Sequence, residues 1–165
     1  MMSSERIRAA QQGDLVAMSE LVDTLTPWVG TLCGSIALDS GPDAAQETLI
    51  QVMRDLPGLR DPAALRAWVR RIATREAVRH ARRERREVAL DEPDRERGSG
   101  PDPALQHDVA LVLAALSPDQ RAILVLRDVE GLSEAEAADA LEVARGTIKS
   151  RLHRAREAFR KRWPT

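Results

Sequence analysis

The sequence of 165 residues is poor in the residue types on which several protein classes depend. Its single cysteine, Cys33, excludes a disulfide framework and any zinc cluster built on cysteines. Tyr is absent, Phe occurs once, and alternation of β-branched with polar residues is nearly absent, so an all-β fold has little support. No uninterrupted apolar run approaches the roughly 18 residues of a membrane span, and residues 1–10 lack the apolar stretch of a secretory signal. We therefore expect a soluble cytoplasmic protein without membrane insertion.

The motifs of common catalytic sites are also missing. The sequence contains no Walker loop, no GxGxxG, no HExxH and no GxSxG. The three histidines, His80, His107 and His153, are scattered and have no partner at the spacing of metal ligands. Cys33 lies among apolar residues, where it is expected to be a small core residue rather than a nucleophile. We expect no catalysis by this chain, no metal and no cofactor.

Helical periodicity fills the first half of the chain. Apolar residues recur at three- and four-residue steps over residues 4–37, with expected breaks at Gly13-Asp14 and Thr26-Pro27. A turn at Ser40–Pro42 leads into a second helix to about residue 54. Its expected buried side comprises Ala45, Leu49, Val52 and Met53. A third helix begins at Asp61-Pro62, after a loop over 56–62, and its apolar stripe ends at Ile72.

Residues 87–103 (EVALDEPDRERGSGPDP) have the composition of a flexible linker, with three Pro, two Gly and many charges. Helical periodicity resumes near residue 104. We therefore predict an all-α protein of two small helical domains, residues 1–86 and 104–165, joined by this linker.

The second half carries clear helix boundaries. Ser117–Gln120 and Ser133–Glu136 have the pattern of capping boxes, in which a Ser side chain and a Gln or Glu three residues later satisfy the first backbone N–H groups. Gly131 is expected to end the helix between them. A last helix is predicted from about residue 145 to Trp163.

The net charge of −1 conceals strong local charge. Residues 66–86 hold nine Arg against two acids, and residues 145–162 hold eight Arg and Lys against one acid, so each segment carries +7. The other residues sum to −15. Such blocks are read segment by segment, and two basic segments indicate contacts with nucleic acid.

The short helix over 133–141, a tight turn and the basic last helix have the pattern of a helix-turn-helix. On the last helix a stripe of Ile148, Leu152, Ala155 and Phe159 is expected to be buried. The opposite face carries Gly146, Ser150, His153 and Arg154, with Thr147, Lys149 and Arg151 at its edges. Such a face can donate to base edges and phosphates in the major groove. The first basic segment lacks this motif, and its arginines suit contacts along a DNA backbone.

Two stretches resemble the extracytoplasmic-function (ECF, group 4) sigma factors of bacterial RNA polymerase. Asp43–Ala73 (DAAQETLIQVMRDLPGLRDPAALRAWVRRIA) is similar to the conserved core of sigma region 2, and Leu116–Phe159 is similar to sigma region 4, most specifically in GTIKSRLHRAR. The resemblance implies a sigma factor that binds core RNA polymerase and directs promoter-specific transcription initiation. An anti-sigma factor is a further partner that the family implies.

The resemblance also implies roles for three sets of residues. Docking on the coiled coil of the polymerase's largest subunit falls to Asp43, Gln46, Glu47 and Gln51, while region 4 faces the polymerase flap. Recognition and melting of the minus-ten element falls to Leu59, Arg60, Asp61, Arg71, Arg75, Arg79, Arg82 and Arg83. Reading of the minus-thirty-five element falls to Arg145, Thr147, Lys149, Ser150, Arg151, His153 and Arg154. The chain departs from the family at Arg75 and Arg79, which stand where an Asn and an Asp are usual.

Two other interpretations stay open. A helix-turn-helix regulator could bind operators alone, although such proteins usually dimerise and the sequence shows no obvious dimer seam. A sigma-like adaptor could bind polymerase without opening DNA. This interpretation stays open because Arg75 and Arg79 stand where the family usually has an Asn and an Asp.

Overall fold

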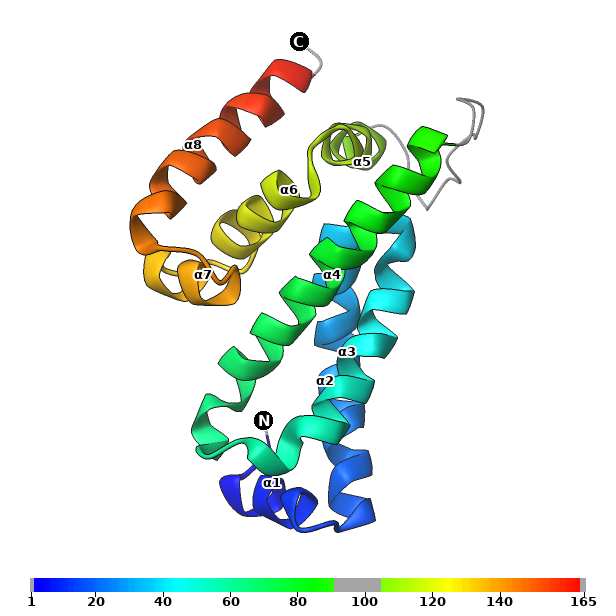
Figure 1. Ribbon diagram of the computed structural model, residues 1–165, viewed down its shortest axis with the longest axis vertical. Coiled ribbons are helices and arrows are strands. Elements are labelled where there is room, and N and C mark those ends of the chain that lie inside the picture. Colours follow the sequence, from blue (N-terminus) through cyan, green and yellow to red (C-terminus); the bar gives the residue numbers. More distant parts are fainter. Residues whose placement is uncertain (1, 91–104, 164–165) are drawn as a thin grey trace.

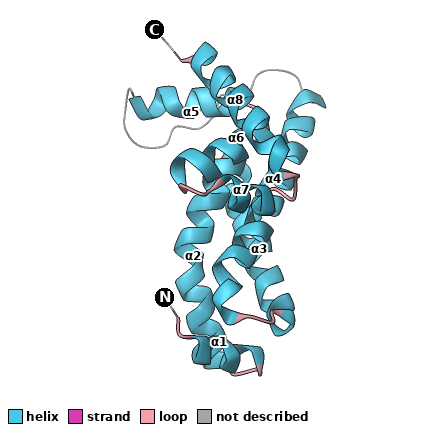
Figure 2. Ribbon diagram, turned by 90° about the vertical axis from the view of Figure 1, so that its left-hand side faces the viewer, coloured by secondary structure: helices cyan, strands magenta, loops and turns pink. Residues whose placement is uncertain are grey.

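A computed structural model describes residues 2–90 and 105–163. The eight α-helices of these ranges are α1 (Ser4–Gln11), α2 (Leu15–Ala37), α3 (Gly41–Asp55), α4 (Leu65–Leu90), α5 (Leu105–Ala115), α6 (Pro118–Leu124), α7 (Glu134–Ala140) and α8 (Arg145–Arg162) (Figure 1). Short 3-10 turns occupy Leu38–Ser40, Leu56–Gly58 and Pro62–Ala64, and a π-helical turn, η4, occupies Val125–Val129. Figure 2 shows the described residues as helices and loops alone, which confirms the all-α prediction.

Helices α1–α4 form an N-terminal bundle in which α2, α3 and α4 pack on one another. Helix α2 lies at its centre, and Leu21, Val29, Leu32 and Ile36 are fully buried. The stretch Leu15–Gly58, which includes α2, contains a window of 18 residues with a mean hydropathy of 1.3, which by length and composition alone could cross a membrane. Eight residues of α2 are buried within this protein, so its apolar composition is that of a core helix.

Three sequence expectations for this bundle are wrong. Helix α2 continues through Pro27, because Leu25 and Val29 on either side share one buried face and their packing outweighs the lost backbone hydrogen bond. The buried stripe of α4 does not end at Ile72 but continues through Ala73, Ala77, Val78 and Ala81. These residues are mostly small and alternate with arginines, so the hydropathy pattern does not mark them as core positions. Met53 is not on the buried side of α3, since 38 % of its surface is exposed.

The helix boundaries follow the capping signals. Asp14 accepts from the backbone of Val16 and begins α2, and Asp61 accepts from Ala63 at the turn before α4. Both capping boxes, at Ser117 and Ser133, are formed in both directions. Gly131 follows η4 and has φ +68°, a backbone conformation that glycine adopts readily because it lacks a Cβ. Helix α4 extends to Leu90, into the segment expected as a linker, and the rest of that segment lies outside the described residues.

The turn between α2 and α3 brings two glycines into close contact. A Cβ added at Gly41 would lie 2.6 Å from the Cα of Gly34. No side chain therefore separates the end of α2 from the start of α3 at this point. Leu38, between them, has a left-handed backbone (φ 55°) that reverses the chain.

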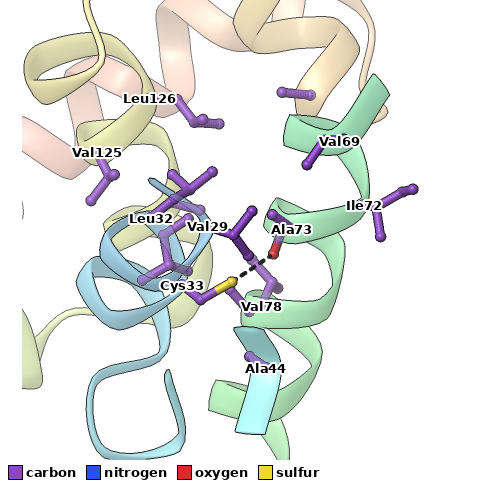
Figure 3. Packing of buried hydrophobic residues seen from close by; sticks show 14 of the residues in the cluster. Val29, Leu32, Cys33, Ala44, Val69, Ile72, Ala73, Val78, Val125 and Leu126 are labelled. Atoms are coloured by element: carbon purple, nitrogen blue, oxygen red, sulfur yellow. Dashed lines mark hydrogen bonds between the residues drawn. The ribbon is translucent and has the colours of Figure 1, made fainter. Parts of the chain in front are cut away.

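Helices α5–α8 form a C-terminal bundle that packs against the first one. Helices α6 and α7 contact α4, and α6 and η4 contact α2. Val125 and Leu126 join Val29, Leu32 and Val69 in one hydrophobic cluster that spans both bundles (Figure 3). The described parts of the two predicted domains therefore share a core, a relation that the sequence left open.

Arg121 of α6 forms hydrogen bonds across the junction between the two bundles. The side chain is 6 % exposed, and its Nε donates to the carbonyl of Ile36 at 2.8 Å. Its Nη1 donates to the carbonyls of Leu113 and Leu116, at 3.1 and 3.0 Å. Ile36 and Leu113 lie in the last turns of α2 and α5, which contain no basic residue of their own. Arg121 thus supplies a cation and hydrogen-bond donors to the carbonyl ends of two helices.

Candidate nucleic-acid interface

The outer face of α8 is the first candidate surface. Ile148, Leu152 and Ala155 are buried, as predicted, and Phe159 is partly buried. The opposite side is consequently exposed at Arg145, Lys149, Ser150, His153 and Arg154, while Thr147 and Arg151 are half-buried. Helices α6 and α7 lie between α8 and α4, so this face points away from the N-terminal bundle (Figure 1).

The cations on this face have few competing partners. Within the described ranges, Arg145, Lys149, Arg151 and Arg154 form no ion pair. Arg154 donates from Nε to the carbonyl of Ser150 at 3.3 Å, one turn earlier on the helix. Arg156 differs from them, because it forms a double contact with Asp128 at 2.5 and 3.1 Å. The face therefore offers donors that are exposed and not neutralised by an acid.

The arginines of α4 are exposed or half-buried but largely paired with acids. Arg82 contacts both carboxylate oxygens of Asp119, at 2.8 and 2.9 Å. Arg83 contacts Glu87 on its own helix at 2.8 Å. The basic segment therefore does not present a row of unpaired charges.

The remaining predicted arginines of α4 are paired as well. Arg71 lies 3.8 Å from Asp139 and 4.0 Å from Glu142. Arg75 lies 4.0 Å from the same Glu142 and 3.6 Å from Glu76. Arg79 contacts Glu76 at 2.5 Å. Glu76 is an almost fully buried acid, 6 % exposed, within this basic segment.

The loop before α4 is held by a residue that sequence reasoning missed. Gln11, at the end of α1, donates from Nε2 to the carbonyls of Leu56 and Leu59, at 3.0 and 2.6 Å. Leu59 is consequently fixed at its backbone, while Arg60 and Asp61 are exposed beside it. No local pattern marks Gln11, because its partners lie 45 and 48 residues away in the sequence.

The exposed side of α3 carries the residues predicted to dock on polymerase. Asp43, Gln46 and Glu47 are exposed. Gln51 is half-buried and accepts a hydrogen bond from Arg75 at 3.1 Å, so it links α3 to α4. The same side exposes two apolar residues that the prediction omitted, Ile50 (46 %) and Met53 (38 %). An apolar pair with polar neighbours is typical of a protein-binding surface.

Metal binding and thiol chemistry can be assessed from the side chains in the described ranges. No three His, Cys, Asp or Glu side chains gather there as a metal ion would require. Cys33 is buried beside Thr48 and the carbonyl of Ala73 (Figure 3), and this burial raises the pKa of its thiol to about 11. The thiol is therefore neutral at physiological pH and a poor nucleophile. The structure agrees with the expectation that Cys33 is a core residue.

Two family models match separate parts of the chain. The sigma-70 region 2 model matches residues 21–87, and the sigma-70 region 4 model matches residues 106–159. The first match includes α3, the loop after it and most of α4. The second includes α6, α7 and most of α8.

Relatives and a solved structure agree with these matches. The chain is similar to the ECF RNA polymerase sigma factor SigE of Mycolicibacterium smegmatis, with 37 % identity over 72 % of this chain and 49 % of that protein, so the match spans about half of SigE. It is 30 % identical to the ECF RNA polymerase sigma-E factor of Salmonella typhimurium over 93 % of this chain and 90 % of that protein. The sigma factor RpoE of Bartonella quintana, solved with the anti-sigma factor NepR, matches with a TM-score of 0.69 and 26 % identity over 87 % of this chain and 94 % of that one.

Proposed function

The chain belongs to the extracytoplasmic-function group of the sigma-70 family, and from this premise we propose that it binds core RNA polymerase in the cytoplasm and directs it to specific promoters. Helix α8 reads the minus-thirty-five element in the major groove, while α3 docks on the largest subunit and α4 with its preceding loop opens the minus-ten element. The chain itself catalyses no reaction.

The observation that carries the proposal is the outer face of α8. Its cations are exposed and form no ion pair within the described ranges, and they lie at the start and middle of the helix that follows a helix-turn-helix corner. Cations that only complement the helix dipole would be confined to the last turn. Arg145, Lys149 and Arg154 lie earlier, where a recognition helix contacts base edges.

The exposed side of α3 supports the docking step. Ile50 and Met53 supply apolar area, and Asp43, Gln46 and Glu47 surround them with groups that can fix an orientation. An interface with an apolar centre and a polar rim has this composition. Substituting Ile50 with Glu is therefore expected to weaken polymerase binding without disturbing the core.

The proposal is tested by run-off transcription with purified core polymerase on templates that carry candidate promoters. Specific transcripts that require this protein support it. DNA binding without transcripts identifies an independent helix-turn-helix regulator, and polymerase binding without DNA opening identifies an adaptor. Either of the last two results replaces the proposed function.

The role of α8 is tested by a pair of matched variants, Arg154→Ala and Arg160→Ala. Both arginines are exposed on α8, and both donate from Nε to the carbonyl four residues earlier, at 3.3 Å. Arg154→Ala is expected to cost about 1–3 kcal/mol of binding to the minus-thirty-five element and to relax its sequence preference. Arg160→Ala should change binding to all sequences alike. Unchanged promoter preference in Arg154→Ala removes this residue from the reading face.

An anti-sigma protein is the further partner that we propose. The similar sigma factor of Bartonella quintana was solved in complex with one. Addition of a candidate anti-sigma protein that binds this chain, followed by measurement of run-off transcripts, tests the proposal, and loss of the transcripts is the expected result. A candidate that binds without reducing transcription contradicts it.

A further inference from the structure

Gln11, at the end of α1, bonds to the loop over residues 56–62, which precedes α4 and carries part of the proposed minus-ten surface. Its Nε2 donates to the carbonyls of Leu56 and Leu59, at 3.0 and 2.6 Å, in a partly buried setting. A side-chain amide nitrogen carries two hydrogens, so each carbonyl receives one of them. A side chain that serves both carbonyls needs two donors, which excludes a charged carboxylate at this position.

Gln11 is itself held in place by the packing of α1. Ile7 and Ala10 of α1 are buried, and α1 packs on α2. Arg6 adds a double contact with Glu20 of α2, at 2.6 and 2.8 Å. Helix α1 also contacts both 3-10 turns of the loop, which lies beside it (Figure 1). The position of Gln11 is therefore fixed relative to the core.

The loop over residues 56–62 has few other attachments between its ends. Leu56 and Pro62 are buried, and of the residues between them Leu59 alone is half-buried and packs on the core. Within the described ranges, the carbonyl of Leu59 accepts from no backbone N–H. Its direction is therefore set by the hydrogen bond from Gln11.

The direction of this carbonyl also determines how the chain enters Arg60. The carbonyl of Leu59 and the N–H of Arg60 belong to one planar trans peptide group, in which they point in opposite directions. The N–H of Arg60 therefore points away from Gln11, and it has no hydrogen-bond partner among the described residues. The side chains of Arg60 and Asp61 are exposed beside it. A free N–H donor and two charged side chains are thus available to DNA.

We propose that Gln11 is a positioning residue for minus-ten recognition, which holds the peptide between Leu59 and Arg60 so that Arg60 and Asp61 meet DNA in one orientation. The inference rests on the proposed function of this loop and adds a residue that lies outside both the loop and α4. Gln11 acts through the backbone and does not touch DNA. Without its two donors the exposed residues would sample several orientations, and correct and incorrect bases would be bound more equally.

Three variants separate this role from simple stabilisation. Gln11→Met removes both donors and keeps an unbranched side chain that suits a helix. Gln11→Lys restores donors, because an ammonium group carries three. Gln12→Met is the matched control, since Gln12 is the next residue, is exposed, and forms no side-chain hydrogen bond within the described ranges.

Discrimination is measured by run-off transcription with the full chain, core polymerase and two competing templates that differ in one base pair of the minus-ten element. The ratio of the two transcripts does not depend on how much of the protein is folded, so a variant that is only destabilised leaves it unchanged. We expect Gln11→Met to lower this ratio about two- to tenfold, as loss of a hydrogen bond of ordinary strength predicts. Gln12→Met should leave the ratio unchanged, and Gln11→Lys should recover most of it.

Templates that differ in the minus-thirty-five element provide an internal control. Helix α8 is proposed to read that element, and Gln11 lies in the other bundle, so all variants should discriminate these templates equally. A loss of discrimination at both elements in Gln11→Met would overturn the proposal, because it would show a general effect on the protein.

The contact of Gln11 is measured separately on the free chain, as hydrogen exchange of side-chain amides followed by nuclear magnetic resonance. The Gln11 amide should exchange more slowly than that of Gln12, because its hydrogens are bonded and partly buried. Equal exchange overturns the contact. Slow exchange with an unchanged minus-ten ratio in Gln11→Met overturns the positioning role. Absence of transcripts with the unmodified protein contradicts the proposed function instead, so the two failures are distinguishable.

Discussion

Substitution of Arg121 by Met is expected to destabilise the protein strongly. Met keeps an unbranched, flexible side chain but is shorter than Arg, so the substitution removes the guanidinium donors and leaves a small space where that group lay. Three hydrogen bonds are lost, to the carbonyls of Ile36, Leu113 and Leu116 at 2.8–3.1 Å. A hydrogen bond from a charged donor contributes about 1.5–3 kcal/mol, and the desolvation cost of the buried guanidinium offsets part of the sum. We expect a net loss of about 3–5 kcal/mol, a large share of the roughly 5–15 kcal/mol that a domain possesses.

The assay is equilibrium urea unfolding followed by far-UV circular dichroism and by tryptophan fluorescence. Because the sequence has three tryptophans, Trp68 and Trp163 are replaced by Phe in all variants. The emission of Trp28, which lies at the junction, then follows separation of the bundles, whereas the dichroism follows loss of helix. The two transitions should coincide in the unmodified protein and separate in Arg121→Met, with fluorescence changing first.

Arg127→Met provides the control in the same bundle. Arg127 is partly buried, and among the described residues it donates to the carbonyl of Leu132, inside the C-terminal bundle. With one hydrogen bond from a charged donor in place of three, we expect a loss of about 1.5 kcal/mol and coincident transitions. A loss below about 1 kcal/mol in Arg121→Met, or a loss equal to that of the control, would refute the reasoning that Arg121 joins two helix ends.

Three further outcomes are expected from the local geometry. Gly41→Ala should cost about 1–3 kcal/mol in urea unfolding, because the new Cβ meets the backbone of Gly34 at 2.6 Å; an unchanged midpoint contradicts this contact. Hydrogen bonds from the Ser133 side chain and backbone lower the pKa of Glu136 below 4.5 in the folded protein. The stabilisation that Glu136 contributes to folding is therefore present above this pH and is lost as the pH falls through the folded-state pKa. The Tm of Glu136→Gln should therefore fall less between pH 6 and pH 4 than that of the unmodified protein, and equal slopes would count against the capping box as its cause. Cys33 should react with iodoacetamide only after unfolding, since burial raises its pKa to about 11; rapid modification of the native protein would show an open core.

The fold was predictable wherever the decisive interaction is local in sequence. The capping boxes at Ser117 and Ser133 and the turn at Gly131 each depend on residues within a few positions of one another, and they lie where the sequence indicates. The buried stripe of α8 follows in the same way from its spacing. Prediction failed at Pro27, where packing against distant helices outweighs a local preference.

The site was predictable only in part, because its charges are paired over long distances. The sequence indicates that α4 is basic, but the acids that face Arg71, Arg75 and Arg82 come from residues 119–142 and are brought there by the fold. The exposure of Ile50 likewise depends on which side of α3 the core covers. Residue type and spacing identify candidate contacts, and only the packing shows which are available.

The contact between Gly34 and Gly41 has a consequence for how the surface of α3 evolves. At that crossing two backbones touch directly, so neither helix can shift toward the other, and no side chain is present whose rearrangement could absorb a change. The distance from this crossing to Glu47 and Ile50 is set by the regular rise of one helix, about 1.5 Å per residue. The outward-facing residues of α3 can therefore vary freely in chemistry while their positions stay constant, which allows affinity for a partner to change without a change in the geometry of docking.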